Sequence, residues 1–281
     1  MPIVLSHYQT RILEKAKANA QTEVTISPDL GLSDVLVTLT DEGGYFPDGE
    51  LLSWAQVAEI SANENNCFVL VEGEFEKILV FSELTNRSYS LMPTEGAPTM
   101  LISGIPMHRI KGVDPHRDTL NKVKTVQPIQ GHVLDTATGL GYTAIETART
   151  AVQVDTIELD PAALEIARHN PWSRGLFDNP KIKQHVGDSF DLILDIGDET
   201  FDCIIHDPPA FSLAGDLYSR EFYGDLYRVL KPGGKLFHYI GNPESKSGAN
   251  VTRGALNRLG EVGFTNLRRQ PRAFGILARK K

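Results

Sequence analysis

An aspartate followed by a glycine turn is the first feature of this sequence that could bind a ligand. In VLDTATGLGY, Asp135 is predicted to end a strand, and Gly139 and Gly141 fall in the turn that opens the next helix. Glycines let the backbone approach a ligand closely, and the free N–H groups at a helix N-terminus attract polar atoms. The dinucleotide fingerprint tolerates alanine at its third glycine position, where Ala144 stands, so the turn alone leaves a nicotinamide cofactor open.

Two further acids are expected at the ends of the following strands. VDTIELD brings Glu158 to a strand end, where a carboxylate accepts hydrogen bonds from both hydroxyls of a ribose. VGDSF brings Asp188 to the end of a third strand, where it suits an adenine amino group. Either acid alone is commonly a helix cap or a loop residue. Together with Asp135 and the glycine turn, they predict a nucleoside-containing cofactor in one crevice.

The segment FDCIIHDPPAF is predicted to form the reaction end of this site. Its apolar run stops at Asp207, and Pro208 and Pro209 then fix the backbone in an extended form without N–H donors. Their carbonyl groups are expected to accept from a substrate amine, with Asp207 beside them and Phe211 as a following aromatic contact. The plainer interpretation is a structural Asp-Pro-Pro turn without chemistry.

These residues need a fold that brings successive strand ends together. From residue 132 onward, apolar runs alternate with turns and helical patterns, which predicts a parallel sheet covered by helices on both faces. The predicted fold class is therefore α/β, with a Rossmann-like, cofactor-binding domain over residues 131–281.

The first part of the chain has a different pattern. Residues 1–105 consist mainly of short β-rich runs separated by turn formers, and one of these runs predicts a single strand over 75–83. Helices are predicted over 7–20 and 53–63. This pattern predicts a small β-rich N-terminal domain. Residues 106–130 are polar and are expected to form a linker or a lid between the two domains.

Composition and charge exclude several other classes of protein. The 281 residues are 41% hydrophobic and 23% charged, as in ordinary folded chains, and the net charge of -8 argues against a broad nucleic-acid-binding surface. The two cysteines, Cys67 and Cys203, lie in apolar runs, so no metal site is predicted. Since neither a basic leader nor a run of about 18 apolar residues is found, we expect a cytoplasmic protein that does not enter a membrane.

The order and spacing of these motifs resemble class I S-adenosylmethionine (SAM)-dependent methyltransferases. The resemblance rests on VLDTATGLGYTAIETA, IELDP, VGDSFDLIL, FDCIIHDPPAF and RVLKPGGKLF. It implies a mostly parallel seven-stranded sheet and SAM as the cofactor. It makes Asp135, Gly139 and Gly141 the loop at the methionine end, Glu158 the ribose ligand and Asp188 the adenine ligand. The neighbours expected to contact the cofactor are Thr136, Ala137, Leu159, Ser189 and Asp207.

The Asp-Pro-Pro segment departs from the pattern of methyltransferases that act on planar amino groups. In those enzymes an aromatic residue follows the second proline, whereas here Ala210 takes that position and Phe211 comes next. DPPAF also resembles certain carbon-methylating RNA methyltransferases, which rely on a nucleophilic cysteine. Cys203 is predicted to lie inside the strand.

A second resemblance connects residues 217–243 with spermidine and spermine synthases, which place a small β-rich domain before the same Rossmann core. Those enzymes transfer an aminopropyl group from decarboxylated SAM and use a strand-end aspartate as base, which would be Asp207. Their GGGDG turn is replaced here by TATGLG, and their DSSDP-like loop by HDPPA. A polyamine also requires several converging acids, for which Asp207 and Asp216 are the candidates.

The favoured function is SAM-dependent methyl transfer, with Asp207, Pro208 and Pro209 positioning the acceptor nucleophile. Aminopropyl transfer from decarboxylated SAM is the first alternative, and a non-catalytic binding protein built on a SAM fold is the second. A nicotinamide-dependent oxidoreductase ranks lower because DPP and LKPGG have no role there. A small molecule, a polyamine and RNA all stay open as acceptors, and the N-terminal domain is the surface expected for any homo-oligomer.

Overall fold

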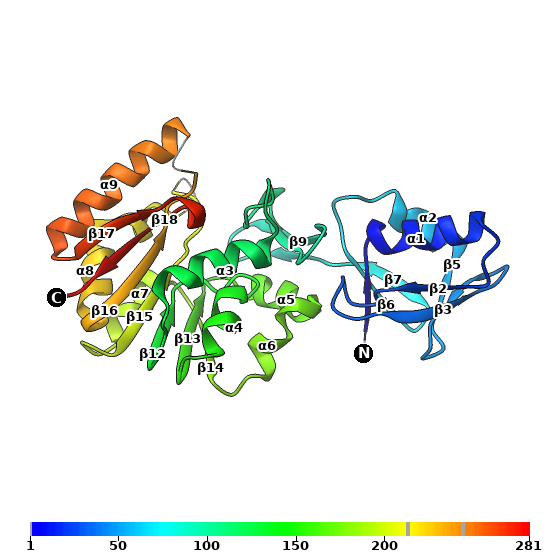
Figure 1. The fold of residues 1–281 in the computed structure, drawn as a ribbon, viewed down its shortest axis with the longest axis horizontal. Helices are drawn as coiled ribbons and strands as arrows, with labels where there is room; N and C mark the ends of the chain where they lie inside the picture. The colour runs from blue at the N-terminus through cyan, green and yellow to red at the C-terminus, as the bar shows by residue number, and fades with distance from the viewer. Residues whose placement is uncertain (1, 212–213, 243–244) are drawn as a thin grey trace. The chain divides into compact units, whose positions relative to one another are not determined.

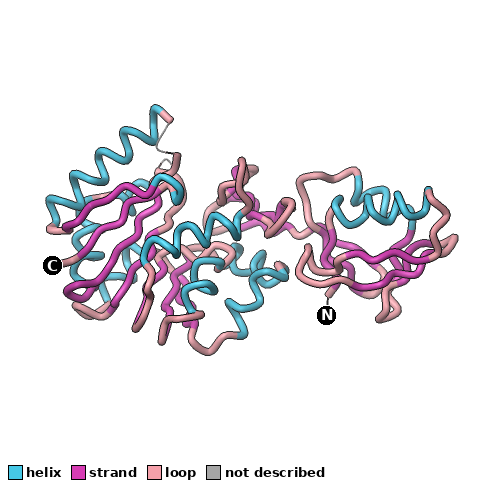
Figure 2. The backbone as a smooth tube through the Cα atoms, in the orientation of Figure 1, coloured by secondary structure: helices cyan, strands magenta, loops and turns pink. Residues whose placement is uncertain are grey.

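The computed structural model describes residues 2–211, 214–242 and 245–281. Within them the chain forms two compact units, drawn as a ribbon in Figure 1 and as a tube in Figure 2. The first unit extends to His116 and includes Ala162–Arg174, and the second consists of Arg117–Pro161 and Gly175–Lys281.

Short antiparallel sheets make up most of the first unit (Figure 2). The described strands are β1 (Ile3–Leu5), β2 (Glu23–Ile26), β3 (Val35–Leu39), β4 (Gly43–Tyr45), β5 (Leu51–Ser53), β6 (Phe68–Val71), β7 (Glu74–Lys77), β8 (Leu79–Ser82), β9 (Arg87–Met92), β10 (Thr99–Ile102) and β11 (Ile105–Pro106). They pair in the orders β1-β6-β7, β2-β3-β4-β5 and β11-β10-β9-β8. The first unit therefore has the β-rich character that its sequence pattern predicts.

Both helices predicted for this part of the chain are present, as α1 (His7–Ala18) and α2 (Trp54–Ser61). Each begins with a serine that caps the helix, while a glutamine three residues later bonds back to the serine N–H. Their apolar faces pack into the core of the unit around Leu13 and Val57, which are fully buried. Ala162–Arg174 adds most of α5 (Pro161–His169) and the short helix η1 (Pro171–Ser173).

The single strand predicted over 75–83 is wrong, because the chain changes pairing partner at Ile78. β7 pairs with β6, whereas β8 pairs with β9 in another sheet. The N–H of Ile78 donates to the Cys67 carbonyl, and the Ile78 carbonyl accepts from the N–H of Leu91. The segment FEKILVFSE contains no glycine or proline, so the sequence gives no sign of where such a switch occurs.

A seven-stranded sheet forms the centre of the second unit (Figure 1). Its strands are β12 (His132–Asp135), β13 (Gln153–Glu158), β14 (Ile182–Val186), β15 (Phe201–His206), β16 (Leu230–Tyr239), β17 (Thr265–Gln270) and β18 (Gly275–Arg279). In the order β14-β13-β12-β15-β16-β18-β17, the first five strands are parallel and β18 is antiparallel to both neighbours. The predicted α/β sheet is confirmed, and it is mixed because of β18. β17 has no counterpart among the predicted strands, since TNLRRQ is polar, as suits an edge strand.

Helices cover both faces of this sheet, with α3 and α4 in front of it and α7 and α8 behind it in Figure 1. The helices are α3 (Pro115–Val126), α4 (Tyr142–Ala148), α6 (Arg174–Asp178), α7 (Ser189–Leu192), α8 (Arg220–Val229) and α9 (Lys246–Val262), with short turns η2 (Ile193–Asp195), η3 (Gly215–Tyr218) and η4 (Pro271–Ala273). α8 and α9 pack Phe222, Leu226 and Leu259 against Ile204 and Leu236 of the sheet. Among the described helices, none combines the length and apolar character that crossing a bilayer requires.

Residues 106–130 were expected to form a polar linker or lid, and the sequence did not predict the helix α3 that they contain. Its buried face contains Asp118, Thr119, Lys122, Val123 and Val126. These positions have helical spacing, but three of the five are polar, so the apolar period that identifies an amphipathic helix is missing.

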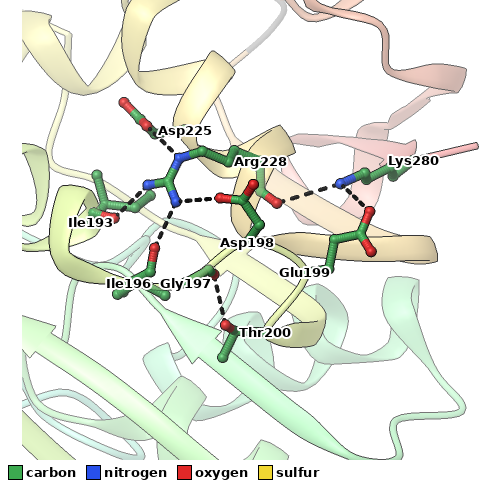
Figure 3. Close-up of polar contacts among 9 residues, drawn as sticks. All are labelled: Ile193, Ile196, Gly197, Asp198, Glu199, Thr200, Asp225, Arg228 and Lys280. Carbon is green, nitrogen blue, oxygen red and sulfur yellow. Dashed lines mark hydrogen bonds and ion pairs between the residues drawn. The ribbon is translucent and has the colours of Figure 1, made fainter.

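A polar cluster centred on Arg228 of α8 fixes the start of β15, at the opposite end of the strand from Asp207 (Figure 3). The Arg228 guanidinium donates to the carboxylates of Asp198 and Asp225 and to the carbonyls of Ile193 and Ile196. Beside it, Lys280 donates to the Arg228 carbonyl and pairs with Glu199. The connection from η2 into β15 is therefore held by side chains of α8 and the C-terminal residues.

Candidate active site

The acids predicted from the sequence meet at one edge of the seven-stranded sheet. Asp135 and Glu158 are the last residues of β12 and β13, Asp207 directly follows β15, and Asp188 lies two residues beyond β14. Because these strands are parallel neighbours, their carboxyl ends face the same side. This is where ligands bind in open α/β sheets.

Asp135 is fully buried, and its two carboxyl oxygens have different surroundings. Oδ2 accepts from the hydroxyls of Thr143, at 2.9 Å, and Thr156, at 3.2 Å. Oδ1 is buried and makes no hydrogen bond to any residue that the structure describes. Burial raises the pKa of Asp135 to about 7, and the nearby charge of Asp207 adds to the rise. A buried acid with one unsatisfied oxygen suits a site that a ligand completes.

The glycine turn takes backbone conformations that side chains disfavour. Gly139 has φ +52° and Gly141 has φ +76°. A Cβ atom at Gly139 would meet nothing within 4 Å, whereas one at Gly141 would lie 2.8 Å from the Leu176 side chain. Gly141 is also the N-cap of α4, and no side chain caps that helix. The turn thus leaves open space beside Gly139 and uses Gly141 for close packing.

Glu158 holds the glycine turn in place from the next strand. Its Oε2 accepts from the N–H of Gly139 at 2.8 Å, and its Oε1 accepts from the N–H of Asp160 at 3.1 Å. Burial raises the pKa of Glu158 to about 6. A carboxylate has about four acceptor positions, so these two bonds leave capacity for ribose hydroxyls. Leu159 is 47% exposed beside it.

Asp188 is exposed and caps the short helix α7 by accepting from the N–H of Phe190. The helix-cap interpretation weighed for this residue is therefore what the structure shows. Ser189 is buried and donates to the Thr136 carbonyl at 2.6 Å, while Ala137 lies half-buried in the same loop. The loops after β12 and β14 are thus joined directly.

Asp207 forms an ion pair that the sequence analysis missed. Its Oδ2 accepts from Nζ of Lys122 on α3 at 2.6 Å, and the same Nζ lies 3.1 Å from Oδ2 of Asp118. The ammonium also lies 4.4 Å from the ring centre of Tyr239. Burial alone would lower the pKa of Lys122, but the charges of Asp207 and Asp118 outweigh it and raise that pKa above its ordinary value. Burial raises the pKa of Asp207, and Lys122 opposes that rise.

The Asp-Pro-Pro segment differs from its prediction in one respect. The Pro209 carbonyl, expected to be free for a substrate amine, already accepts from the Tyr218 hydroxyl at 3.0 Å. Pro208 is buried. Phe211 is 50% exposed, and its ring meets the Tyr218 ring edge-on at 5.4 Å. Phe211 is therefore the accessible aromatic side chain of the segment.

Two buried histidines lie on the strands next to the Asp-Pro-Pro segment. His206, the last residue of β15, bonds through Nδ1 to the Thr136 hydroxyl and through Nε2 to the Leu217 carbonyl. His238 on β16 bonds to the Tyr223 hydroxyl at 2.7 Å. Burial lowers the pKa of His206 to about 3, so this imidazole is neutral. The sequence did not mark either residue as part of a site, because His206 ends an apolar run and His238 lies between Phe237 and Tyr239.

Neither cysteine supplies a nucleophile. Cys203 is buried within β15, and burial raises the pKa of its thiol to about 12. Cys67 is also buried, and its pKa is raised well above the ordinary value. The prediction that Cys203 lies inside its strand is confirmed.

Comparison with known proteins identifies the family. The chain is 42% identical, over 99% of its length and 97% of the other, to the uncharacterized protein MJ1233 of Methanocaldococcus jannaschii. The chain belongs to the MJ1233 family. In this chain, residues 133–234 match the family model described as a methyltransferase domain. The resemblance to class I SAM-dependent methyltransferases is thereby confirmed.

Polyamine-forming enzymes are similar to this member of the MJ1233 family over smaller parts of their chains. Polyamine aminopropyltransferase 2 of Streptomyces coelicolor is 33% identical over 100 residues, which are 34% of this chain and 18% of that protein. The spermidine synthase structure from Thermotoga maritima has a TM-score of 0.57 at 19% identity, covering 74% of this chain and 75% of that one. A spermidine synthase bound to the transition state analogue AdoDATO gives 0.58 at 20% identity, covering 74% and 76%. At such identities the structures show a shared fold. Residue 243, the last of the stretch predicted to resemble these enzymes, lies outside the described residues.

Proposed function

We propose that this protein is a SAM-dependent methyltransferase. The observation that carries the proposal is the meeting of Asp135, Glu158, Asp188 and Asp207 at the carboxyl edge of one methyltransferase-type sheet. Any one of these acids could be structural, as Asp188 is in capping α7. Their convergence beside the open turn at Gly139 supports a nucleoside cofactor.

The residues of this edge fit the parts of SAM. The open turn at Gly139 would hold the methionine end, with the buried Asp135 behind it. Glu158 would hold the ribose and Asp188 the adenine amino group. When bound, the cofactor supplies a carbon already activated by a sulfonium, so the protein mainly aligns the acceptor and manages one proton.

Asp207 is the residue we assign to the acceptor. Its side chain is 17% exposed, while Lys122 beside it is 3% exposed, so the carboxylate is the part of the pair that an acceptor reaches. Lys122 occupies Oδ2 and fixes the orientation of the carboxylate. The other oxygen then orients an acceptor N–H or O–H.

Aminopropyl transfer from decarboxylated SAM is the second candidate. It is supported by the local identity to a polyamine aminopropyltransferase and by the likeness in fold to spermidine synthases. The two reactions use the same electrophilic sulfonium and differ in the cofactor that is bound.

Calorimetric titration of the full chain with SAM, decarboxylated SAM and NAD tests the proposal. We expect SAM to bind most tightly. Preference for decarboxylated SAM would favour aminopropyl transfer over methyl transfer as the function. Binding of NAD alone would overturn the cofactor assignment.

Methyl transfer itself is measured with labelled SAM in a cell extract. Asp207→Asn should bind SAM as the unchanged protein does but lose at least ~99% of the transfer, within the 10²–10⁴-fold contribution of a positioned proton acceptor. Asp195→Asn, at an exposed aspartate on η2, is the matched control. Tight SAM binding without transfer to any acceptor would favour a non-catalytic binding protein.

A further inference from the structure

His206, the last residue of β15, bonds to two different loops through the two nitrogens of its ring. Nε2 lies 2.9 Å from the Leu217 carbonyl, and Nδ1 lies 2.7 Å from the Thr136 hydroxyl. A carbonyl oxygen can only accept, so Nε2 carries the ring proton. Because burial lowers the pKa of His206 to about 3, the ring is neutral and Nδ1 accepts from the Thr136 O–H. The contacts therefore fit one tautomer of the ring.

Thr136 belongs to the loop that is assigned to the cofactor. It is the first residue after β12, its N–H donates to the Ile205 carbonyl at 3.1 Å, and its carbonyl accepts from the Ser189 hydroxyl at 2.6 Å. The residue is buried. With its hydroxyl bound to His206, Thr136 fixes the start of the loop that leads to the open turn at Gly139.

Leu217 belongs to the short helix η3 (Gly215–Tyr218), which follows the Asp-Pro-Pro segment. Its carbonyl accepts from His206, and the next residue, Tyr218, donates its hydroxyl to the Pro209 carbonyl at 3.0 Å. Two hydrogen bonds thus join η3 to the end of β15 and to the residues directly after it. The position of η3, and through Tyr218 that of the Asp-Pro-Pro backbone, therefore depends on the ring of His206.

We propose that His206 is a positioning residue that aligns the acceptor side of the site with the cofactor side. Through Nδ1 it holds the cofactor loop at Thr136, and through Nε2 it holds η3 and the Asp-Pro-Pro segment. The inference rests on the proposed function, since it assumes that these loops hold the cofactor and the acceptor. His206 is fully buried, so it acts through the loops and not by contact with a reactant. Alignment matters because a misplacement of about 1 Å lowers the rate of such a reaction about 100-fold.

Two substitutions separate the roles of the two nitrogens. His206→Asn places an amide oxygen near the position of Nδ1 and no donor at that of Nε2, so it should keep the bond to Thr136 and lose the bond to Leu217. His206→Gln extends an amide N–H to the position of Nε2, so it should do the reverse. Thr136→Val and Tyr218→Phe each remove one hydroxyl with little change in shape, and they test the same two contacts without altering the buried ring. His169→Asn, at an exposed histidine of α5, is the matched control.

SAM affinity is measured by calorimetry on the full chain, and transfer is measured with labelled SAM in a cell extract. We expect His206→Gln and Thr136→Val to lose at least about fivefold in SAM affinity, since each leaves a buried polar group of the cofactor loop unpaired or removes its bond. We expect His206→Asn and Tyr218→Phe to bind SAM as the unchanged protein does but to lose at least about tenfold in transfer at saturating SAM. His206→Gln should retain most of its transfer at saturating SAM.

Hydrogen exchange of the ligand-free protein provides a readout that needs neither SAM nor an acceptor. We expect peptides that cover Gly215–Tyr218 to exchange faster in His206→Asn than in the unchanged protein, because η3 loses its bond to the end of β15. His206→Gln and His169→Asn should exchange there as the unchanged protein does.

Equal losses of SAM affinity and of transfer in the two His206 variants would overturn the inference, because a merely structural role affects both quantities alike. Full transfer by both His206→Asn and Tyr218→Phe would overturn it as well. An unchanged protein that binds no SAM would instead contradict the proposed function, and the exchange measurement would still show whether His206 holds η3. The two failures are therefore distinguished.

Discussion

Nζ of Lys122 lies 2.6 Å from Oδ2 of Asp207, although 85 positions separate the two residues in the sequence. The contact joins α3, which precedes the sheet, to the loop after β15. It makes the charge state of the Asp-Pro-Pro segment depend on a helix that lies outside the predicted cofactor motifs.

Replacing Lys122 by methionine should destabilise the protein. The change leaves Asp118 and Asp207 without their buried cation, which typically costs about 3–5 kcal/mol. Asp118→Asn/Lys122→Met should lose less, because it removes one uncompensated carboxylate. Urea unfolding followed by circular dichroism measures both, with the exposed Lys124→Met as control. Equal unfolding midpoints for Lys122→Met and Lys124→Met would contradict the buried ion pairs of Lys122 with Asp118 and Asp207.

Asp135→Asn should stabilise the ligand-free protein at pH 8 and weaken SAM binding. The folded-state pKa of Asp135 is about 7 against an ordinary 3.8. Its contribution to the free energy of unfolding is therefore complete below about pH 4 and is lost as pH rises through about 7. The variant should gain on the order of 1–3 kcal/mol at pH 8 and little at pH 4.

Urea unfolding at both pH values and a SAM titration check this prediction. Asp191→Asn, at an exposed aspartate of α7, serves as control. The idea fails if Asp135→Asn has the same stability difference between pH 4 and pH 8 as the unchanged protein.

Acid should unfold the protein partly through His206. Burial depresses the pKa of His206 from 6.5 to about 3 in the folded state. A neutral imidazole therefore contributes stability that is complete above pH 6.5 and is lost as pH falls towards 3, at up to about 1.4 kcal/mol per pH unit. His206→Asn should show a shallower loss over this range, while His169→Asn, at an exposed site, should match the unchanged protein. Parallel curves for all three proteins would refute the assignment.

The two glycines of the turn should respond differently to alanine. Gly139→Ala places a Cβ in open space and should cost about 1 kcal/mol through its positive φ alone. Gly141→Ala adds a clash with Leu176 and should cost about 2–4 kcal/mol. Thermal and urea unfolding measure the difference, and an equal loss for both variants would argue against the packing at Gly141.

The meeting of the residues assigned to the cofactor could be predicted, because these residues follow directly from strand ends. Asp135 and Glu158 end apolar runs, and parallel strands must bring their carboxyl ends to one edge. The glycine turn has a positive φ at both predicted positions. These features are local, so the sequence pattern contains them.

The position of Asp207 after its strand was predicted, but the contacts of the Asp-Pro-Pro segment could not be, because they join distant parts of the chain. Lys122 lies on a helix whose buried face is largely polar, so no apolar period marks it. The occupation of the Pro209 carbonyl depends on where Tyr218 turns back towards the segment. The partner of a buried charge is a property of the packed structure, not of the neighbouring sequence.

The position of Lys122 also determines when the site is complete during synthesis. The chain leaves the ribosome from its N-terminus, so Lys122 and Asp118 are synthesised before the other partners of Lys122. Asp207 and Tyr239 emerge later. The contacts of Lys122 with these two residues are therefore among the last of the candidate site to form, once residue 239 has emerged.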